Sequence, residues 1–323
     1  MVVARVRRTR RDPHPARHRE TVTAMPRTPL HILQFGATGQ VARCLSALAD
    51  DDLKITALPR TVADLTDDDA VQRAIHEAPS DTAVIVNLAA YTAVDAAETD
   101  RDTAFAVNGR APGVMAKAAR ARGLPLIHLS TDYVFDGSAS QPYRESDRTS
   151  PLGVYGASKH AGEIAVMEAS PDAVVMRTAW VFSAHGKNFV RTMVRLAAER
   201  AEISVVDDQL GCPTPAAAIA DAIASLGRTL AGQERPADSA GVFHFCGDRT
   251  MSWCGFADAI FERLAAAGLK RPHLHPIPTS AYPTPASRPA YSVLDCSRIH
   301  DVYGVKAADS LAGLDSVLTE ILK

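Results

Sequence analysis

From Leu30 onward, short apolar runs alternate with longer alanine-rich stretches whose apolar residues recur at helical spacing. This alternation predicts strands at 30–35, 54–58, 83–88, 125–130 and 173–178, separated by helices at 40–49, 67–77, 101–122 and 155–169. Pro112 lies inside the third of these helices and predicts a kink or a helix start there. Strands that alternate with helices form a parallel sheet with helices on both faces. We therefore expect an α/β fold built on a Rossmann-type, doubly wound parallel sheet.

The alternation loosens after Trp180, where prolines interrupt the chain and the expected strands become isolated ones, such as 203–206 and 242–245. We therefore expect a Rossmann domain at 29–182 and a smaller C-terminal lobe at 183–323, some segments of which return to the first domain. Ligands of open α/β sheets bind in the crevice at the carboxyl ends of the strands. The cleft between the two lobes is the expected ligand site.

Composition excludes several classes of partner. The chain has 323 residues and a formal net charge of −2, which provides no basic field for a nucleic acid. No apolar run approaches the roughly 20 residues that cross a bilayer, so we expect no membrane insertion. The five cysteines form no Cys-x-x-Cys pair, which indicates neither a zinc site nor a disulfide framework. Free thiols are typical of a reducing compartment, and we expect a cytoplasmic protein.

The first 28 residues are rich in arginine and lack apolar periodicity, so we expect a disordered basic tail at 1–28. The tail is interpreted as dispensable, or as a start codon placed too early with Met25 as the true start. A nucleic-acid arm and a targeting peptide are the less favoured alternatives, since no apolar segment of the signal-peptide type is present.

A glycine-containing turn follows the first expected strand and opens the first expected helix. Gly36 permits the tight turn, Gly39 lets the backbone approach a pyrophosphate, and the small Ala42 allows close helix packing. Free N–H groups at the helix start face the anion. The sequence therefore predicts a dinucleotide site here, with Thr38, Gln40 and Val41 among the contacts.

The end of the second expected strand favours NADPH, with NADH left open. An acidic residue there would accept hydrogen bonds from the ribose of NAD, whereas this chain carries Arg60, which suits a 2′-phosphate. Asp64, followed by Leu65, could accept from the adenine amino group. The alternatives are a solvated surface role for Arg60, and a helix cap or turn for Asp64.

Tyr155 and Lys159 are four residues apart at the start of an expected helix, so both project from one face. An ammonium beside a phenol lowers the phenol pKa and makes it a stronger acid toward a carbonyl oxygen. Thr131 ends the fourth expected strand and could hold that carbonyl near Tyr155. The alternatives are a chance pair on a surface helix, and a turn cap for Thr131.

Several ordered motifs resemble the extended short-chain dehydrogenases, and within them the dTDP-4-dehydrorhamnose reductase family. They are Gly36-x-x-Gly39-Gln40, Asn87 to Asp95, Ser130 to Gly137, Tyr155-x-x-x-Lys159, Arg177 to Phe182, Asn188-Phe189, Asp207 to Thr214 and Arg288 to Asp295. The resemblance extends from about residue 30 to the C-terminus.

The resemblance implies NADPH-dependent reduction of dTDP-4-dehydro-β-L-rhamnose to dTDP-β-L-rhamnose. It implies that Tyr155 is the acid, that Lys159 holds the nicotinamide ribose and lowers the Tyr155 pKa, and that Thr131 orients the carbonyl. The lobe at 183–323 would bind substrate. The remaining residues implied are Ala89, Ala90 and Tyr91 at the cofactor, and Val94, Asp132 and Trp180 at the sugar, with an aromatic core role as the alternative for Trp180.

Some residues depart from the family pattern, and other readings stay open. Cys44 lies near where some members carry an acidic residue linked to a metal at a dimer contact, so we expect no metal and leave a homodimer open. A dehydratase commonly has Asp-Glu after the threonine, whereas Asp132-Tyr133 follows Thr131 here. Another nucleotide-sugar 4-keto reductase or epimerase, and a non-catalytic NADP-binding regulatory subunit, are the alternative functions.

Overall fold

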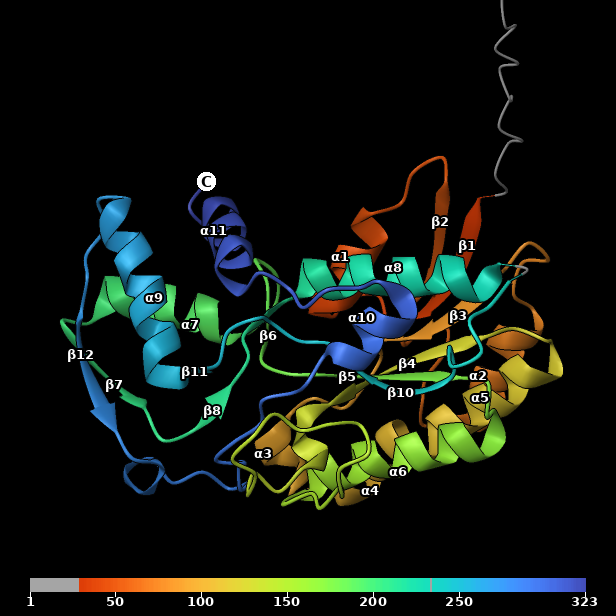
Figure 1. Ribbon diagram of the computed structural model, residues 1–323, viewed down its shortest axis with the longest axis horizontal. Helices are drawn as coiled ribbons and strands as arrows, with labels where there is room; N and C mark the ends of the chain where they lie inside the picture. Colours follow the sequence, from red (N-terminus) through yellow and green to blue (C-terminus); the bar gives the residue numbers. More distant parts are fainter. Residues whose placement is uncertain (1–28, 233) are drawn as a thin grey trace, which may run out of the picture.

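A six-stranded parallel sheet forms the centre of the computed structural model, which describes residues 29–232 and 234–323 (Figure 1). The predicted disordered tail at 1–28 lies outside the described residues. The sheet order is β10-β5-β4-β3-β1-β2, and every neighbouring pair is parallel. Its strands are β1 (Leu30–Phe35), β2 (Leu53–Leu58), β3 (Val84–Asn87), β4 (Leu126–Thr131), β5 (Val174–Thr178) and β10 (Gly241–His244). The α/β, Rossmann-type prediction is confirmed.

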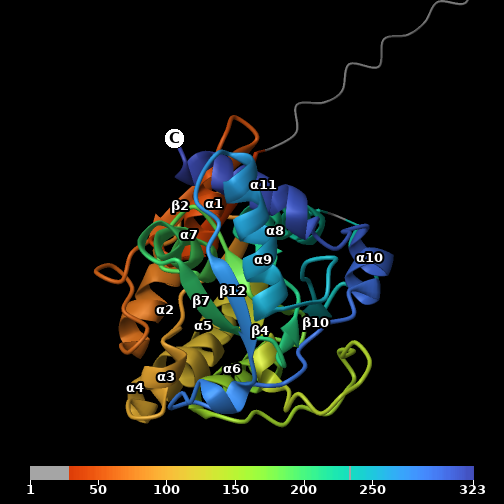
Figure 2. The same ribbon diagram turned by 90° about the vertical axis from the view of Figure 1, so that its left-hand side faces the viewer.

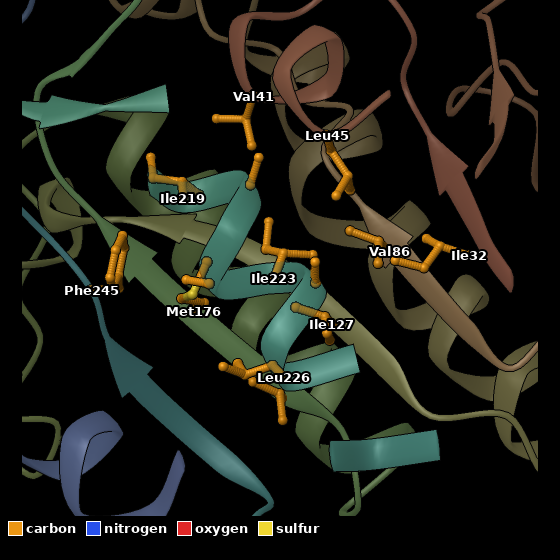
Figure 3. Packing of buried hydrophobic residues seen from close by; sticks show 14 of the residues in the cluster. Ile32, Val41, Leu45, Val86, Ile127, Met176, Ile219, Ile223, Leu226 and Phe245 are labelled. Carbon is orange, nitrogen blue, oxygen red and sulfur yellow. The ribbon is translucent and has the colours of Figure 1, made fainter. Parts of the chain in front are cut away.

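Helices cover both faces of this sheet because its strands are apolar on both sides. In β1, Ile32 packs into the cluster that contains α8, whereas Leu33 packs into the opposite cluster with α2 and α5. Figure 3 shows Ile219, Ile223 and Leu226 of α8 lying over the strands. One face carries α1 (Gln40–Ala47), α8 (Ala216–Ala231) and α10 (Ser297–Tyr303); the other carries α2 (Asp68–His76), α5 (Ala111–Ala121) and α6 (Val154–Ala169).

The helix expected at 101–122 is continuous but changes its winding. It consists of α4 (Arg101–Phe105), a π-helical segment (Ala106–Arg110) and α5, which begins one residue before Pro112. Proline has no N–H to donate to the preceding turn, so a regular ladder cannot pass through it. The expected irregularity near Pro112 is thus present as a change of winding within one continuous helix, and no separate helix starts there.

The strand expected near 242–245 is not an isolated strand of the second lobe, and that prediction is wrong. It is β10, which pairs parallel with β5 and completes the edge of the central sheet. Helix α8, also beyond residue 182, packs against α1 and β1. Both segments lie on the first domain because their apolar faces complete its core.

The remaining C-terminal elements form a smaller lobe, which faces the viewer in Figure 2. Its buried side chains make a separate core. Phe256 and Ile260 of α9 pack there with Val205 and Val190. The lobe contains α7 (Phe189–Glu199), β7 (Glu202–Val206), α9 (Trp253–Ala266), β12 (His273–Ile277) and α11 (Ser310–Ile321), with the parallel pair β7–β12. The chain also forms two short strand pairs: β8 (Leu210–Gly211) with β11 (Met251–Ser252), and β6 (Val181–Phe182) with β9 (Thr214–Pro215).

The strand order places a ligand crevice between β1 and β3. The chain leaves β1 to form β2 on one side and then returns to form β3 on the other. At such a reversal the connections diverge and leave a crevice at the carboxyl ends of the strands. No helix among the described residues is long and apolar enough to cross a membrane.

Candidate active site

A cavity of about 570 Å³ opens at this crevice and brings together residues from six separate segments. The predicted site residues that line it are Thr38, Gly39, Gln40, Val41, Ala90, Val94, Thr131, Asp132, Tyr155, Lys159 and Trp180. These residues lie at or just after the carboxyl ends of β1, β3, β4 and β5, or in the first two turns of α1 and α6. The parallel sheet places these strand ends at one edge, which explains their convergence.

Other predicted cofactor residues do not line this cavity. Arg60 is exposed, and its Nε donates a hydrogen bond to Asp64 Oδ2 at 3.0 Å. Asp64 also accepts from the backbone N–H and hydroxyl of Thr66, and the backbone hydrogen bond lowers the pKa of Asp64 most. Leu65 is buried in the core beneath α2, which leaves its side chain unavailable to a ligand. Tyr91 exchanges two backbone hydrogen bonds with the Asn108 side chain.

The turn after β1 has the backbone geometry of a phosphate cradle. Gly36 has a φ of +92°, and a Cβ there would lie 3.1 Å from the backbone nitrogen of Ala89. Gly39 caps α1 with its backbone alone, and the space where its Cβ would lie is open. Unpaired N–H groups at a helix start together with room for close approach fit the pyrophosphate of a dinucleotide.

Tyr155 lies in the first turn of α6, close to the end of β4. Gly156 allows this approach, because a Cβ there would lie 2.2 Å from the carbonyl oxygen of Tyr133. Burial raises the pKa of Tyr155 to about 12, although the Thr131 hydroxyl acts in the opposite direction and lowers this pKa. The net direction is upward because burial outweighs the other effects, and the lowering of this pKa by Lys159 stays a prediction. The phenol keeps its proton at neutral pH, as an acid must before it delivers one.

Lys159 is buried below Tyr155 in a network of polar groups. Its Nζ donates to the carbonyl oxygen of Leu129 at 2.7 Å and lies 3.3 Å from Nε2 of His128. Burial lowers the pKa of Lys159 to about 8 and holds the pKa of His128 well below its usual value. On the other side of the ring, His128 Nδ1 lies 3.0 Å from the amide nitrogen of Asn87, whose oxygen accepts from Ala89 N.

A buried ion pair supports the same helix from beneath. Arg177 on β5 binds Glu163 on α6 through two hydrogen bonds, at 2.9 and 2.7 Å, and the Ser130 hydroxyl donates to the same carboxylate. Both charged side chains are 4% exposed. Sequence reasoning overlooked Asn87, His128, Glu163 and the ion-pair role of Arg177. Their signal was a polar residue within an otherwise apolar strand or helix face.

Asp132 lines the cavity and has a buried carboxylate that is only partly hydrogen-bonded. Oδ1 accepts from the Thr131 hydroxyl at 3.0 Å, whereas Oδ2 is buried without a partner. Burial raises the pKa of Asp132 to about 6. Asp132 is among the residues that line the cavity, and a buried polar atom without a partner calls for an explanation, such as a contact with a bound ligand.

Replacing Asp132 by asparagine is expected to raise the melting temperature more at pH 7 than at pH 4.5. With a folded-state pKa of about 6, above the ordinary value of about 3.9, Asp132 destabilises the fold as pH rises through this interval, by up to about 3 kcal/mol. Asparagine does not ionise, so it avoids this loss. Thermal unfolding of both proteins at the two pH values is the measurement. An equal difference in melting temperature at both would contradict the raised pKa.

The described residues contain no cluster of side chains that could bind a metal ion. Among residues 29–232 and 234–323, no group of three or more His, Cys, Asp or Glu side chains is arranged to hold a metal ion.

Comparison with known proteins gives a consistent set of relatives. The family model described as "RmlD substrate binding domain" matches residues 30–322. A dTDP-4-dehydrorhamnose reductase from Burkholderia thailandensis is 46% identical over 289 residues, which cover 87% of this chain and 95% of that protein. Two reductases of the same name have similar structures at 32% identity. One, from Clostridium acetobutylicum, has a TM-score of 0.83 and covers 91% of this chain and 100% of its own. The other, from Bacillus anthracis in complex with NADP, has a TM-score of 0.82 and covers 90% and 99%.

Proposed function

The chain belongs to the dTDP-4-dehydrorhamnose reductase family, and we propose that it reduces the 4-keto group of dTDP-4-dehydro-β-L-rhamnose with NADPH to give dTDP-β-L-rhamnose. The observation that carries this proposal is the position of Tyr155. Its side chain lines the same cavity as the glycine turn and as Thr131 and Asp132. A proton donor, a cradle for a dinucleotide and polar groups for a sugar thus share one space.

The residues present fit NADPH. The turn from Gly36 to Val41 would hold the pyrophosphate, and Lys159 would hold the nicotinamide ribose. When bound, NADPH supplies a hydride to the carbonyl carbon.

Tyr155 donates its phenolic proton to the sugar oxygen as negative charge develops there. Thr131, which lines the same cavity as Tyr155, holds the carbonyl oxygen beside the phenol. The positive charge of Lys159 stabilises the phenolate that remains, and solvent later restores the proton. Asp132 Oδ2 accepts a hydrogen bond from a sugar hydroxyl, while Val94 and Trp180 contact the apolar side of the ring.

The test is oxidation of NADPH at 340 nm with dTDP-4-dehydro-β-L-rhamnose generated in situ. Rapid oxidation with dTDP-rhamnose as product is the expected result. NADPH binding without turnover would favour another nucleotide sugar or a regulatory subunit. Against the regulatory alternative, Thr131, Tyr155 and Lys159 are all present at one cavity. A cytoplasmic location and the formation of a homodimer remain predictions.

Replacing Arg60 by alanine is expected to raise the KM for NADPH about tenfold more than the KM for NADH. The exposed guanidinium at the end of β2 offers a charge to the 2′-phosphate that NADH lacks, and a charge-assisted pair of this kind is worth roughly one factor of ten. Initial rates with both cofactors are the measurement. Arg73→Ala removes an equally charged and exposed side chain from α2 and is the control. Equal changes for both cofactors would remove Arg60 from the phosphate site.

A further inference from the structure

The two tryptophans of this chain stack on each other across the two lobes. The sequence contains two, Trp180 and Trp253. Their ring centroids lie 3.4 Å apart and their planes differ by 2°. Trp180 follows β5 of the central sheet, whereas Trp253 is the first residue of α9 in the smaller lobe. The contact therefore joins elements that are distant in the sequence.

The backbone at Trp180 is held in an unfavourable conformation. Its φ is +46°, and among the described residues no other non-glycine residue has a positive φ. A bulky residue adopts this region only where its surroundings impose it. One such constraint is close packing: a Cβ on Gly211 would lie 2.3 Å from the Trp180 ring. Strain of this kind commonly accompanies a functional position.

Trp253 is itself anchored away from the reacting residues. Its Nε1 donates to Gln209 Oε1 at 3.2 Å, and Gln209 donates in turn to the Thr279 hydroxyl at 3.0 Å. Ser252 caps α9 by accepting from the backbone N–H of Gly255. The indole is thus fixed by its place at the first residue of α9 and by the hydrogen bonds that run through Gln209 to Thr279.

The stack stands at the boundary between two cavities. Trp180 and Trp253 line the cavity of about 570 Å³ that also contains Tyr155, called the catalytic cavity below. Trp253 and Phe189 also line a second cavity, of about 890 Å³, in the smaller lobe. The rings of Phe189 and Trp253 lie 4.7 Å apart. The Trp253 ring therefore lies in the wall that the two cavities share, in contact with Trp180.

We propose that Trp253 is a positioning residue for the substrate, because its stacked ring holds Trp180 in place as the wall of the catalytic cavity. The proposal rests on the proposed function, since it assigns Trp180 a contact with the sugar. Trp253 acts through Trp180 and takes no part in proton transfer. Its loss lowers the affinity for the nucleotide sugar while the chemical step and NADPH binding continue.

The stack can be tested without substrate. Stacked indoles couple their ultraviolet transitions. The near-ultraviolet absorbance and circular dichroism of the wild type plus those of the double variant Trp180→Phe/Trp253→Phe should therefore differ from the sum for Trp180→Phe and Trp253→Phe, a comparison in which the tyrosine contributions cancel. Because the chain has two tryptophans, no other indole contributes. Spectra that add within error would overturn the stacked arrangement.

The functional test is the separation of KM from kcat. In Trp253→Leu, the KM for dTDP-4-dehydro-β-L-rhamnose should rise about tenfold, the upper range for loss of an aromatic contact. We expect kcat and the Kd for NADPH to stay within about threefold. Trp253→Phe retains an aromatic face and should recover most of the loss. Phe261→Leu, which removes a buried ring from the same helix but does not line either cavity, is the matched control for destabilisation.

Two outcomes would overturn the proposal: an unchanged KM in Trp253→Leu, or parallel changes in KM, kcat and the Kd for NADPH that Phe261→Leu reproduces. Failure of the proposed function gives a different result, because the wild type itself would then show no turnover. In that case dTDP-β-L-rhamnose, which carries the sugar, is used as the binding probe and dTDP as its sugar-free comparison. The inference stands only if Trp253→Leu weakens binding of dTDP-β-L-rhamnose more than binding of dTDP.

Discussion

Replacing Tyr155 by phenylalanine is expected to lower kcat roughly a thousandfold, within the range for loss of a general acid. The ring stays and fills the same buried space beside Thr131 and Tyr133, so NADPH binding should be retained. Single-turnover rates and the Kd for NADPH are the measurements.

Tyr143→Phe is the matched control. Tyr143 is also buried, but it lies outside the catalytic cavity, where its hydroxyl hydrogen-bonds with Asp136. The same chemical change there should cost some stability and leave turnover within about threefold. Turnover of Tyr155→Phe close to the wild-type rate would remove Tyr155 as the acid.

Replacing Arg177 by methionine is expected to lower the free energy of unfolding by about 3 to 5 kcal/mol. Glu163 would keep its buried charge and lose both of its hydrogen bonds to Arg177. Because Glu163 lies one turn after Lys159 on α6, activity should fall as well. Denaturant unfolding followed by circular dichroism measures the loss of stability.

The double variant Glu163→Leu/Arg177→Met should regain most of that stability, since replacing a buried pair by apolar residues is often neutral. Arg271→Met is the matched single change at an exposed pair. Its distance to Asp258 is also 2.7 Å, yet both partners are about half exposed, so the loss should stay below about 1 kcal/mol. Equal losses in Arg177→Met and Arg271→Met would show that burial does not govern the energy of the Arg177–Glu163 pair.

Local patterns were sufficient for the first five strands of the central sheet. The five strands expected there occur to within one residue of their predicted bounds. The glycine turn follows β1, and Tyr155 and Lys159 share one face of α6. These features depend on apolar periodicity, turn chemistry and helical spacing, which act between residues close in the chain. The sequence by itself therefore determined the fold class and the placement of Tyr155 and Lys159 together on α6 at the cavity.

The tertiary structure alone decided which distant segments meet. Strand β10 is short and joins the sheet through hydrogen bonds to β5, and the local pattern could not reveal this partner. Trp253 meets Trp180, and His128 meets Lys159, through packing between separate elements. The raised pKa of Tyr155 has the same origin, because burial depends on every segment that excludes water from the phenol. Spacing along the chain determines which side chains share a face, whereas burial and pairing depend on the assembled core.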